Sequence, residues 1–165
     1  IARRQRQMCI RDRPLRAYLI CKRIMLEQKI EKLLEKDIES LGCFIWGIEI
    51  SGNSISKHVV IYIDKKDNLV ALEDCERVNI QVREVLENLS DLNFNYSLEV
   101  SSPGIDRKFF RINQLKDYLG ETVKVSCFLD GKKCKLKGEL KNVSETEISL
   151  ISQGLELHCQ PLMEP

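Results

Sequence analysis

The sequence has no run of eighteen or more apolar residues, and the apolar patch at 17–21 is short and lies among arginines. We therefore expect neither a membrane-spanning helix nor a secretory signal peptide. The seven cysteines are an odd number, and no two of them are spaced as Cys-x-x-Cys. This spacing argues against a disulfide framework and against a zinc site, so we expect reduced structural thiols and a cytoplasmic protein.

The sequence also lacks the motifs of common active sites. It has no Gly-x-Ser-x-Gly elbow and no glycine-rich loop that ends in Lys-Ser or Lys-Thr. Ser101 and Ser102 stand near Asp106, but a nucleophilic serine needs a positioned base, and His58 and His158 are the only histidines. His58 is predicted to be a surface histidine with no serine or cysteine in a suitable position. We expect no enzymatic activity, no cofactor and no metal.

What the sequence does have is charge, and the charge is segregated. Residues 1–23 carry eight basic residues against one acidic, residues 24–100 carry eight against fifteen, and residues 101–165 carry ten against nine. Within 101–141 the balance is ten against five. An acidic domain repels nucleic acid and attracts basic proteins, whereas a basic stripe can approach phosphates.

Residues 1–23 show no apolar periodicity that would bury a helix face. The string that begins at Gln7, Gln-Met-Cys-Ile-Arg-Asp-Arg, resembles the translated product of a sequencing-library adapter. One interpretation is therefore a non-native or disordered extension ahead of a native start near Met25. The alternative is a basic arm that binds RNA. Deletion of 1–23 would separate the two, because an arm predicts a large loss of binding.

Residues 24–100 are predicted to form one α/β domain. Apolar residues recur at helical spacing before Gly42, and a second apolar stripe follows an acidic first turn. Strand-like runs lie between and after these stripes, the first two joined by a tight turn at 51–54. The expected elements are a helix over 25–41, strands over 43–50 and 58–64, a helix over 72–89 and a strand over 96–100.

This α-β-β-α-β order predicts a two-layer domain of an α+β protein, similar to KH domains. KH domains clamp the nucleic-acid backbone with a Gly-x-x-Gly loop, and the sequence has none. Because 24–100 is also acidic, direct RNA binding by this domain is disfavoured and a basic protein is the better partner. Trp46 has no second aromatic at matching spacing, so it is predicted to pack rather than to stack on a base.

The stretch Leu98–Arg107 is expected to be a hinge between two domains. Pro103 fixes its own φ and favours an extended Ser102. Gly104 can adopt the positive φ that the third position of a type II turn requires. The chain must therefore turn sharply here, and after the turn the pattern changes to short strands.

The string Glu-Val-Ser-Ser-Pro-Gly-Ile-Asp-Arg at 99–107 resembles the signature of the bacterial ribosome maturation factor RimP family, and the resemblance runs from about Ile24 to about Leu162. It implies an α/β domain, this turn and a small SH3-like or Sm-like β-barrel. It also implies a non-enzymatic assembly factor that binds the immature small ribosomal subunit, at the decoding-region ribosomal protein (small-subunit protein twelve) and nearby rRNA. The residues expected to act as interdomain hinge or partner contacts are Ser101, Ser102, Pro103, Gly104, Asp106 and Arg107.

A linker over 101–119 is expected to lead into the second domain, residues 120–165. The predicted strands are 123–129, 133–143, 147–151 and 155–160, with turns at Asp130-Gly131 and 152–154. Gly138 falls inside the second of them, where a small barrel bends sharply. Members of the family usually continue through another short strand, so a missing last strand is expected to leave an open edge.

Basic residues with interleaved aromatics follow the hinge. Phe109 and Phe110 stand among the first of these basic residues. The candidate RNA or protein contacts are Lys108, Arg111, Lys116, Lys132 and Lys133. The alternative is that the two phenylalanines dock the linker on the barrel while the charges stay in solvent.

Three functions remain open on the sequence. An assembly factor predicts weak affinity for free RNA and tight association with immature small subunits. An Sm-like or KH-like RNA chaperone predicts strong, salt-dependent binding to naked RNA. An adaptor that binds peptides at an open barrel edge by strand addition has no specific support.

Overall fold

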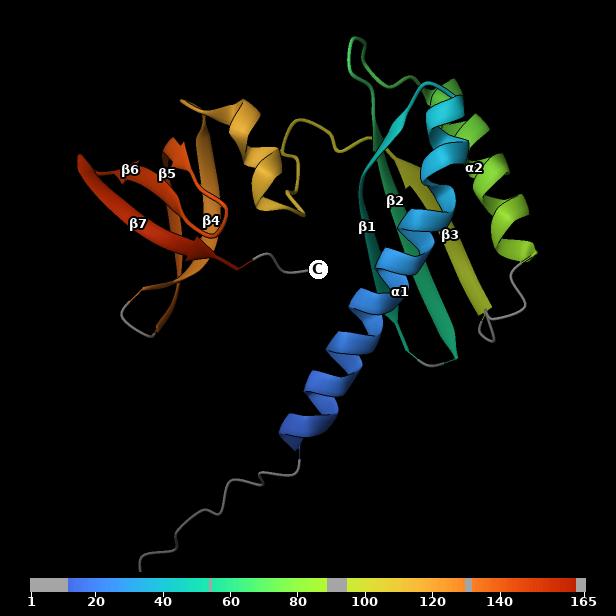
Figure 1. Cartoon of the computed structure of the whole chain (residues 1–165), viewed down its shortest axis with the longest axis horizontal. Helices are drawn as coiled ribbons and strands as arrows, with labels where there is room; N and C mark the ends of the chain where they lie inside the picture. Colours follow the sequence, from blue (N-terminus) through green and yellow to red (C-terminus); the bar gives the residue numbers. More distant parts are fainter. Residues whose placement is uncertain (1–11, 54, 89–94, 130–131, 163–165) are drawn as a thin grey trace, which may run out of the picture. The chain divides into compact units, whose positions relative to one another are not determined.

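The computed structural model describes the backbone of residues 12–53, 55–88, 95–129 and 132–162, and the side chains of the same ranges except 12–24, 128–129 and 132–133. The chain divides into two compact units, unit 1 (residues 1–102) and unit 2 (residues 103–165), as Figure 1 shows. The division falls between Ser102 and Pro103.

Unit 1 contains, in chain order, α1 (Asp12–Ser40), β1 (Phe44–Gly52), β2 (Ser56–Asp64), α2 (Leu72–Glu87) and β3 (Asn95–Ser101). This order confirms the predicted α-β-β-α-β arrangement. β2 is the central strand, and it pairs antiparallel with β1 and parallel with β3 (Figure 1). The parallel pair needs a crossover connection, and α2 provides it.

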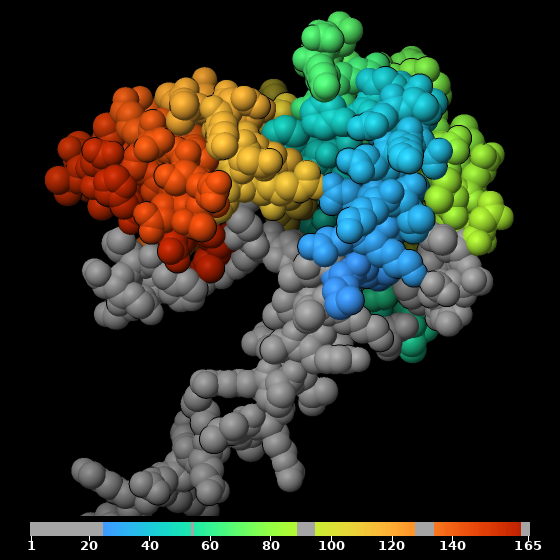
Figure 2. Space-filling model, viewed as in Figure 1, coloured from blue at the N-terminus to red at the C-terminus, as the bar shows by residue number. Residues whose placement is uncertain are grey.

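One apolar core lies between the two helices and the sheet of unit 1. Figure 2 shows the described side chains of α1, in blue to cyan, beside those of α2, in green. On α1, Ile30, Leu34 and Ile38 recur every four residues and are at most 2% exposed, whereas Leu33, which the spacing assigns to the same face, is 39% exposed. Trp46 is buried, as predicted. In the part of the chain that the structure describes, no helix is long and apolar enough to span a membrane.

α1 begins at Asp12 and not near Met25. The predicted helix start near Met25 is therefore wrong. The interpretation of 1–23 as a non-native or disordered extension stays a prediction, and residues 1–11 lie outside the described residues. Arginine is a good helix former, and aspartate and proline suit a first helical turn, as Asp12 and Pro14 do here. A missing apolar stripe argues against burial of this segment but does not prevent a helix.

Glycines with positive φ end α1 and β1. Gly42 has a φ of 77°, and the N–H of Cys43 donates to the Ile38 carbonyl (3.3 Å), which confirms the predicted helix stop. Gly52 has a φ of 100°, and a Cβ at this position would collide with the Ser56 carbonyl oxygen. The reversal between β1 and β2 therefore requires glycine.

A buried carboxylate fixes the connection from β2 to α2. The Asp74 side chain, in the first turn of α2, is only 4% exposed. It accepts hydrogen bonds from the Lys65 ammonium (2.6 Å), from the backbone N–H of Ala71 (2.9 Å) and from the Arg77 guanidinium. These bonds, the one from Lys65 above all, lower the pKa of Asp74 from 3.8 to about 2.

Unit 2 contains η1 (Ile112–Tyr118), a 3-10 helix that the sequence does not predict, followed by β4 (Thr122–Leu129), β5 (Lys132–Val143), β6 (Ile148–Ser152) and β7 (Leu155–Pro161). The strand positions agree with the predicted ones to within one residue at each end. The predicted turn at Asp130-Gly131 lies outside the described residues, as does Leu89, the predicted end of α2.

The four strands of unit 2 form an antiparallel sheet in which each strand pairs with the next. The first and last strands also pair, because Cys127 and Phe128 of β4 lie opposite Pro161 and Gln160 of β7. This part of β4 is therefore not the open edge that the sequence predicts.

The strands of unit 2 approach each other closely at Gly138. A Cβ added there would lie 2.5 Å from the carbonyl oxygen of Ile151 on β6, which explains why this strand carries a glycine. Ser149 is also buried, and its hydroxyl has no hydrogen-bond partner among the described residues. The buried apolar core of unit 2 is small: Leu115, Val123, Cys127, Leu140, Ile148, Leu150 and Cys159.

Candidate interaction site

The turn after β3 has the geometry that the sequence predicts at its glycine. Gly104 has a φ of 70°, and nothing lies within 4 Å of the position that a Cβ would take. Glycine is therefore favoured here by the backbone conformation and not by crowding. Ser101 is the last residue of β3, pairs with Tyr62 and donates its hydroxyl hydrogen to the carbonyl of Ser102 (3.2 Å).

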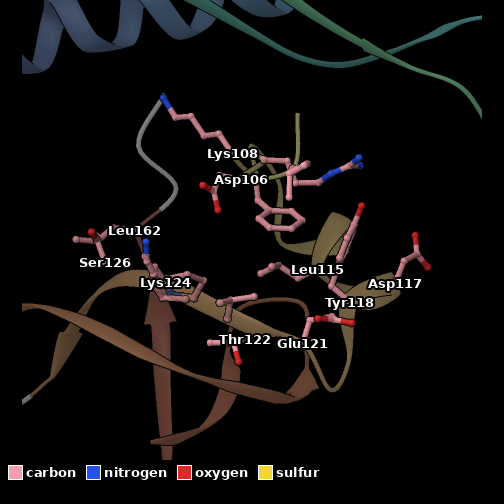
Figure 3. A pocket seen from close by; sticks show the side chains of 16 residues that line it. Asp106, Lys108, Leu115, Asp117, Tyr118, Glu121, Thr122, Lys124, Ser126 and Leu162 are labelled. Carbon is pink, nitrogen blue, oxygen red and sulfur yellow. The ribbon is translucent and has the colours of Figure 1, made fainter. Parts of the chain in front are cut away.

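A cavity of about 770 Å³ opens in unit 2 directly after this turn (Figure 3). The linker 105–109, η1, the first half of β4 and Pro161–Leu162 form its wall. The backbone N–H of Leu162 donates to the Ser126 carbonyl (2.7 Å) and ties the end of the wall to β4. The charged residues of the wall are balanced in sign: Asp106, Asp117 and Glu121 against Arg107, Lys108 and Lys124.

Tyr118, at the end of η1, is the centre of the aromatic contacts. The guanidinium carbon of Arg107 lies 5.5 Å from the centroid of the Tyr118 ring, within the range of a cation–π interaction. Phe109 meets the same ring edge-on, with the two centroids 5.0 Å apart. Because Phe109 also packs on the core of unit 2, the predicted docking role is confirmed for this phenylalanine. The Phe110 ring centroid lies 5.5 Å from Lys108 Nζ.

Gln114 sets the direction of the linker. The side-chain Oε1 of Gln114 accepts hydrogen bonds from the backbone N–H groups of Phe110 (2.8 Å) and Arg111 (3.0 Å). The backbone N–H of Gln114 donates to the Arg111 carbonyl (3.2 Å). The bond from the N–H of Arg111, the residue before η1, to the Gln114 side chain is that of a capping box. The sequence holds a signal for this bond, because Gln114 stands three residues after Arg111, but the bond was not predicted.

The remaining predicted contact residues do not gather at the first cavity. Lys116 is exposed and lines a second cavity in unit 2, of about 530 Å³, together with Glu145. Arg111 is exposed at the start of η1. Lys132 and Lys133 belong to β5, and their side chains are outside the described residues.

Four charged or aromatic residues that line the first cavity were not predicted from the sequence: Asp117, Tyr118, Glu121 and Lys124. They lie around the same cavity as Arg107 because η1 and the start of β4 form its wall together with the linker (Figure 3). None of the described histidines or cysteines lines the cavity. Opposite charges around an aromatic edge are suited to recognition of a polar surface.

Residues 33–106 match the family model described as the RimP N-terminal domain. This match supports the RimP family. The match includes most of unit 1 and the Pro-Gly turn, and it ends at Asp106, so the resemblance carried by 99–107 is confirmed. A RimP N-terminal domain indicates a ribosome maturation factor family.

On the sheet of the RimP N-terminal domain, His58 has polar neighbours that the sequence did not predict. Its Nδ1 lies 2.8 Å from Ser97 Oγ, and its Nε2 lies 3.3 Å from Glu99 Oε2. The parallel register of β2 and β3 brings these residues together. The expectation that no serine stands near His58 is therefore wrong. With 44% of its side chain exposed, His58 does lie at the surface, and the three residues line neither cavity of unit 2.

Among the described residues, no group of three or more His, Cys, Asp or Glu side chains is arranged to hold a metal. The RimP N-terminal domain contributes two of the five described free thiols, and unit 2 contributes three. Burial raises the pKa of the thiols of Cys43, Cys75, Cys127 and Cys159. These four thiols are therefore protonated at neutral pH, which makes them weak nucleophiles.

Proposed function

We propose that this protein is a non-enzymatic, cytoplasmic assembly factor that binds the immature small ribosomal subunit. The observation that carries the proposal is the RimP N-terminal domain at residues 33–106, followed by a separate β unit. From the order of elements we assign a KH-like fold to unit 1, and from the pairing of β4 with β7 we assign an SH3-like or Sm-like barrel to unit 2.

Two segments of the chain differ in charge, which supports a division of labour between them. Residues 24–100 carry eight basic residues against fifteen acidic, and residues 101–141 carry ten against five. We propose that the acidic segment 24–100 faces a basic ribosomal protein, by family resemblance that of the decoding region, while the basic segment 101–141 approaches nearby rRNA. Ser101, Ser102, Pro103 and Gly104 would set the direction in which the chain leaves β3.

The cavity of unit 2 is the contact site that we propose for the ribosomal partner. Arg107 and Tyr118 present a cation and an aromatic ring together, and both types of side chain are frequent at the centre of binding interfaces. Asp106 and Lys108 flank them with opposite charges. Such a site can orient a polar partner without any chemical step.

Sedimentation of a cell extract in a sucrose gradient tests the proposal. The protein is expected to travel with immature small subunits and not with complete ribosomes or at the top of the gradient. Arg107→Ala combined with Tyr118→Ala removes the cation and the ring, and we expect at least about a tenfold loss of subunit-bound protein, since residues of these types contribute ≥ 2 kcal/mol where they are hot spots. Lys141→Gln is the matched control, because Lys141 is exposed, pairs with Glu139 and does not line the cavity.

The RNA chaperone predicts a different result. It requires tight binding to naked RNA that weakens steeply with salt, with no preference for small subunits. A protein that stays with free RNA throughout the gradient would contradict the assembly-factor proposal.

A further inference from the structure

Three lysines share the outer face of β4 and β5, and we call this group the lysine face: Lys124, Lys135 and Lys137. The register places Lys124 directly opposite Lys137, and Ser126 opposite Lys135. Successive residues of a strand point to opposite faces, so the three lysines lie on one side while Val123 and Cys127 face the core. All three lysines are exposed.

The lysine face has no internal compensation. Like charges directly opposite each other destabilise a pair of strands. Within the described part of the chain, none of the three lysines forms an ion pair. Glu139 is the nearest carboxylate along β5 on this side, and it is paired with Lys141 at 2.7 Å. The sequence therefore keeps a repulsion that an anionic partner would relieve.

The pattern of neighbouring side chains favours RNA over an acidic protein. Among the described side chains, the residues that neighbour the lysines on the outer face, Thr122, Ser126 and Glu139, are polar. Lys124 also lines the cavity that holds Tyr118. A protein partner usually needs apolar or aromatic anchors at the centre of its interface. Phosphates need only cations at suitable spacing, and Lys135 and Lys137 are two residues apart on one strand, roughly 7 Å.

We propose that Lys124, Lys135 and Lys137 bind the phosphate backbone of RNA. This inference deepens the proposed function, on which it rests for its biological setting, because it names the surface that approaches rRNA. The lysine face supplies position and affinity, while sequence preference would have to come from elsewhere, since phosphate contacts carry no base information.

The test replaces the three lysines by glutamine and measures binding of a fluorescent single-stranded oligouridylate at several salt concentrations. Each phosphate contact on a single strand contributes about 0.7 to the slope of log K against log salt, so the slope is expected to fall by about 2. The matched control is the triple change Lys32→Gln, Lys36→Gln, Lys66→Gln, which removes the same charge from exposed positions of unit 1. This control is expected to leave the slope nearly unchanged.

Misfolding would lower the thermal stability of unit 2. Removal of the Lys124–Lys137 repulsion should instead leave that stability unchanged or higher, so the two causes of weaker binding can be distinguished. An unchanged slope in the lysine-face variant, an equal fall in the control, or tighter binding to polyglutamate than to the oligouridylate would overturn the inference. Gradient sedimentation keeps the two proposals distinct. A protein that never joins small subunits but shows the fall in slope would sink the assembly-factor proposal alone.

Discussion

Unit 1 and unit 2 bury very different cores. Among the described residues, the core of unit 1 has thirteen buried residues, nearly all of them Ile, Leu or Val from α1, β1, β2 and α2. That of unit 2 has seven, and two of them are the cysteines Cys127 and Cys159. A small domain buries a smaller fraction of its surface, and a unit of about 60 residues is expected to unfold at a cost of roughly 3–9 kcal/mol. The β unit therefore has the narrower stability margin.

The difference between the cores is tested most strongly by matched truncations. Leu140 in unit 2 and Ile61 in unit 1 are both 0% exposed. Each change to alanine is expected to cost about 2–5 kcal/mol. We expect Leu140→Ala to unfold much of unit 2 at room temperature, while Ile61→Ala leaves unit 1 folded. Hydrogen exchange followed by mass spectrometry reports each unit separately. Full protection of unit 2 in Leu140→Ala would contradict the comparison.

A smaller effect is expected at Gly138. Alanine there would collide with the β6 backbone at Ile151, and overpacking of this kind costs about 1–3 kcal/mol. Urea denaturation should show the loss in the transition of unit 2 only. Lys135→Ala, at an exposed position of the same strand, is the control and should change stability by no more than about 0.5 kcal/mol. Equal effects of the two variants would mean that β5 and β6 can separate at Gly138 without cost.

The stability of unit 1 is expected to depend on pH through the titration of Asp74. Because its pKa falls from 3.8 to about 2 on folding, the unfolded chain binds this proton more readily than the folded chain does. The stabilisation is complete at neutral pH and is lost as the pH falls from about 4 towards 2. Asp74→Asn should therefore lower the melting temperature of unit 1 at pH 6, and the difference from the unchanged protein should shrink towards pH 2.

Asp67→Asn is the control for this titration, since Asp67 is exposed in the preceding loop. The melting temperature of unit 1 is measured at several pH values. A difference between Asp74→Asn and the unchanged protein that is equally large at pH 6 and at pH 2 would contradict the role of Asp74.

The smallest expected effect is at Ser149. Its buried hydroxyl has no partner among the described residues, and an unpaired buried polar group costs free energy. Ser149→Ala is expected to leave the stability of unit 2 unchanged or to raise it by up to about 1 kcal/mol. Calorimetry can resolve this change. A clear loss of stability would show that the hydroxyl is hydrogen-bonded in solution.

The sequence predicted the elements of both units well because their apolar patterns are regular. It placed α2 and the four strands of unit 2 correctly, and Gly42 and Gly104 have the positive φ expected of them. It failed at the start of α1, where the residues have no periodic apolar stripe to reveal a helix. It also missed η1, which is too short to show a period.

The candidate site was only partly predictable. Arg107 and Lys108 stand out as basic residues beside aromatics, but their approach to Tyr118 depends on the bonds that Gln114 makes to the linker. His58 and Ser97 lie far apart in the chain, and only the parallel register of β2 and β3 joins them. Local sequence patterns indicate which residues carry charge, whereas contacts between residues far apart in the chain depend on tertiary structure.

Cys127 and Cys134 face each other across β4 and β5, with their sulfur atoms 3.5 Å apart. Residues paired in this way on antiparallel strands have Cα atoms close enough for a covalent cross-link without backbone movement. Burial keeps the Cys127 thiol protonated, so we expect cross-linking in air to be slow, and the stapled species would have its own electrophoretic mobility. A thiol reductant in the storage buffer, or Cys134→Ser, should preserve a homogeneous sample for every measurement of the fragile β unit.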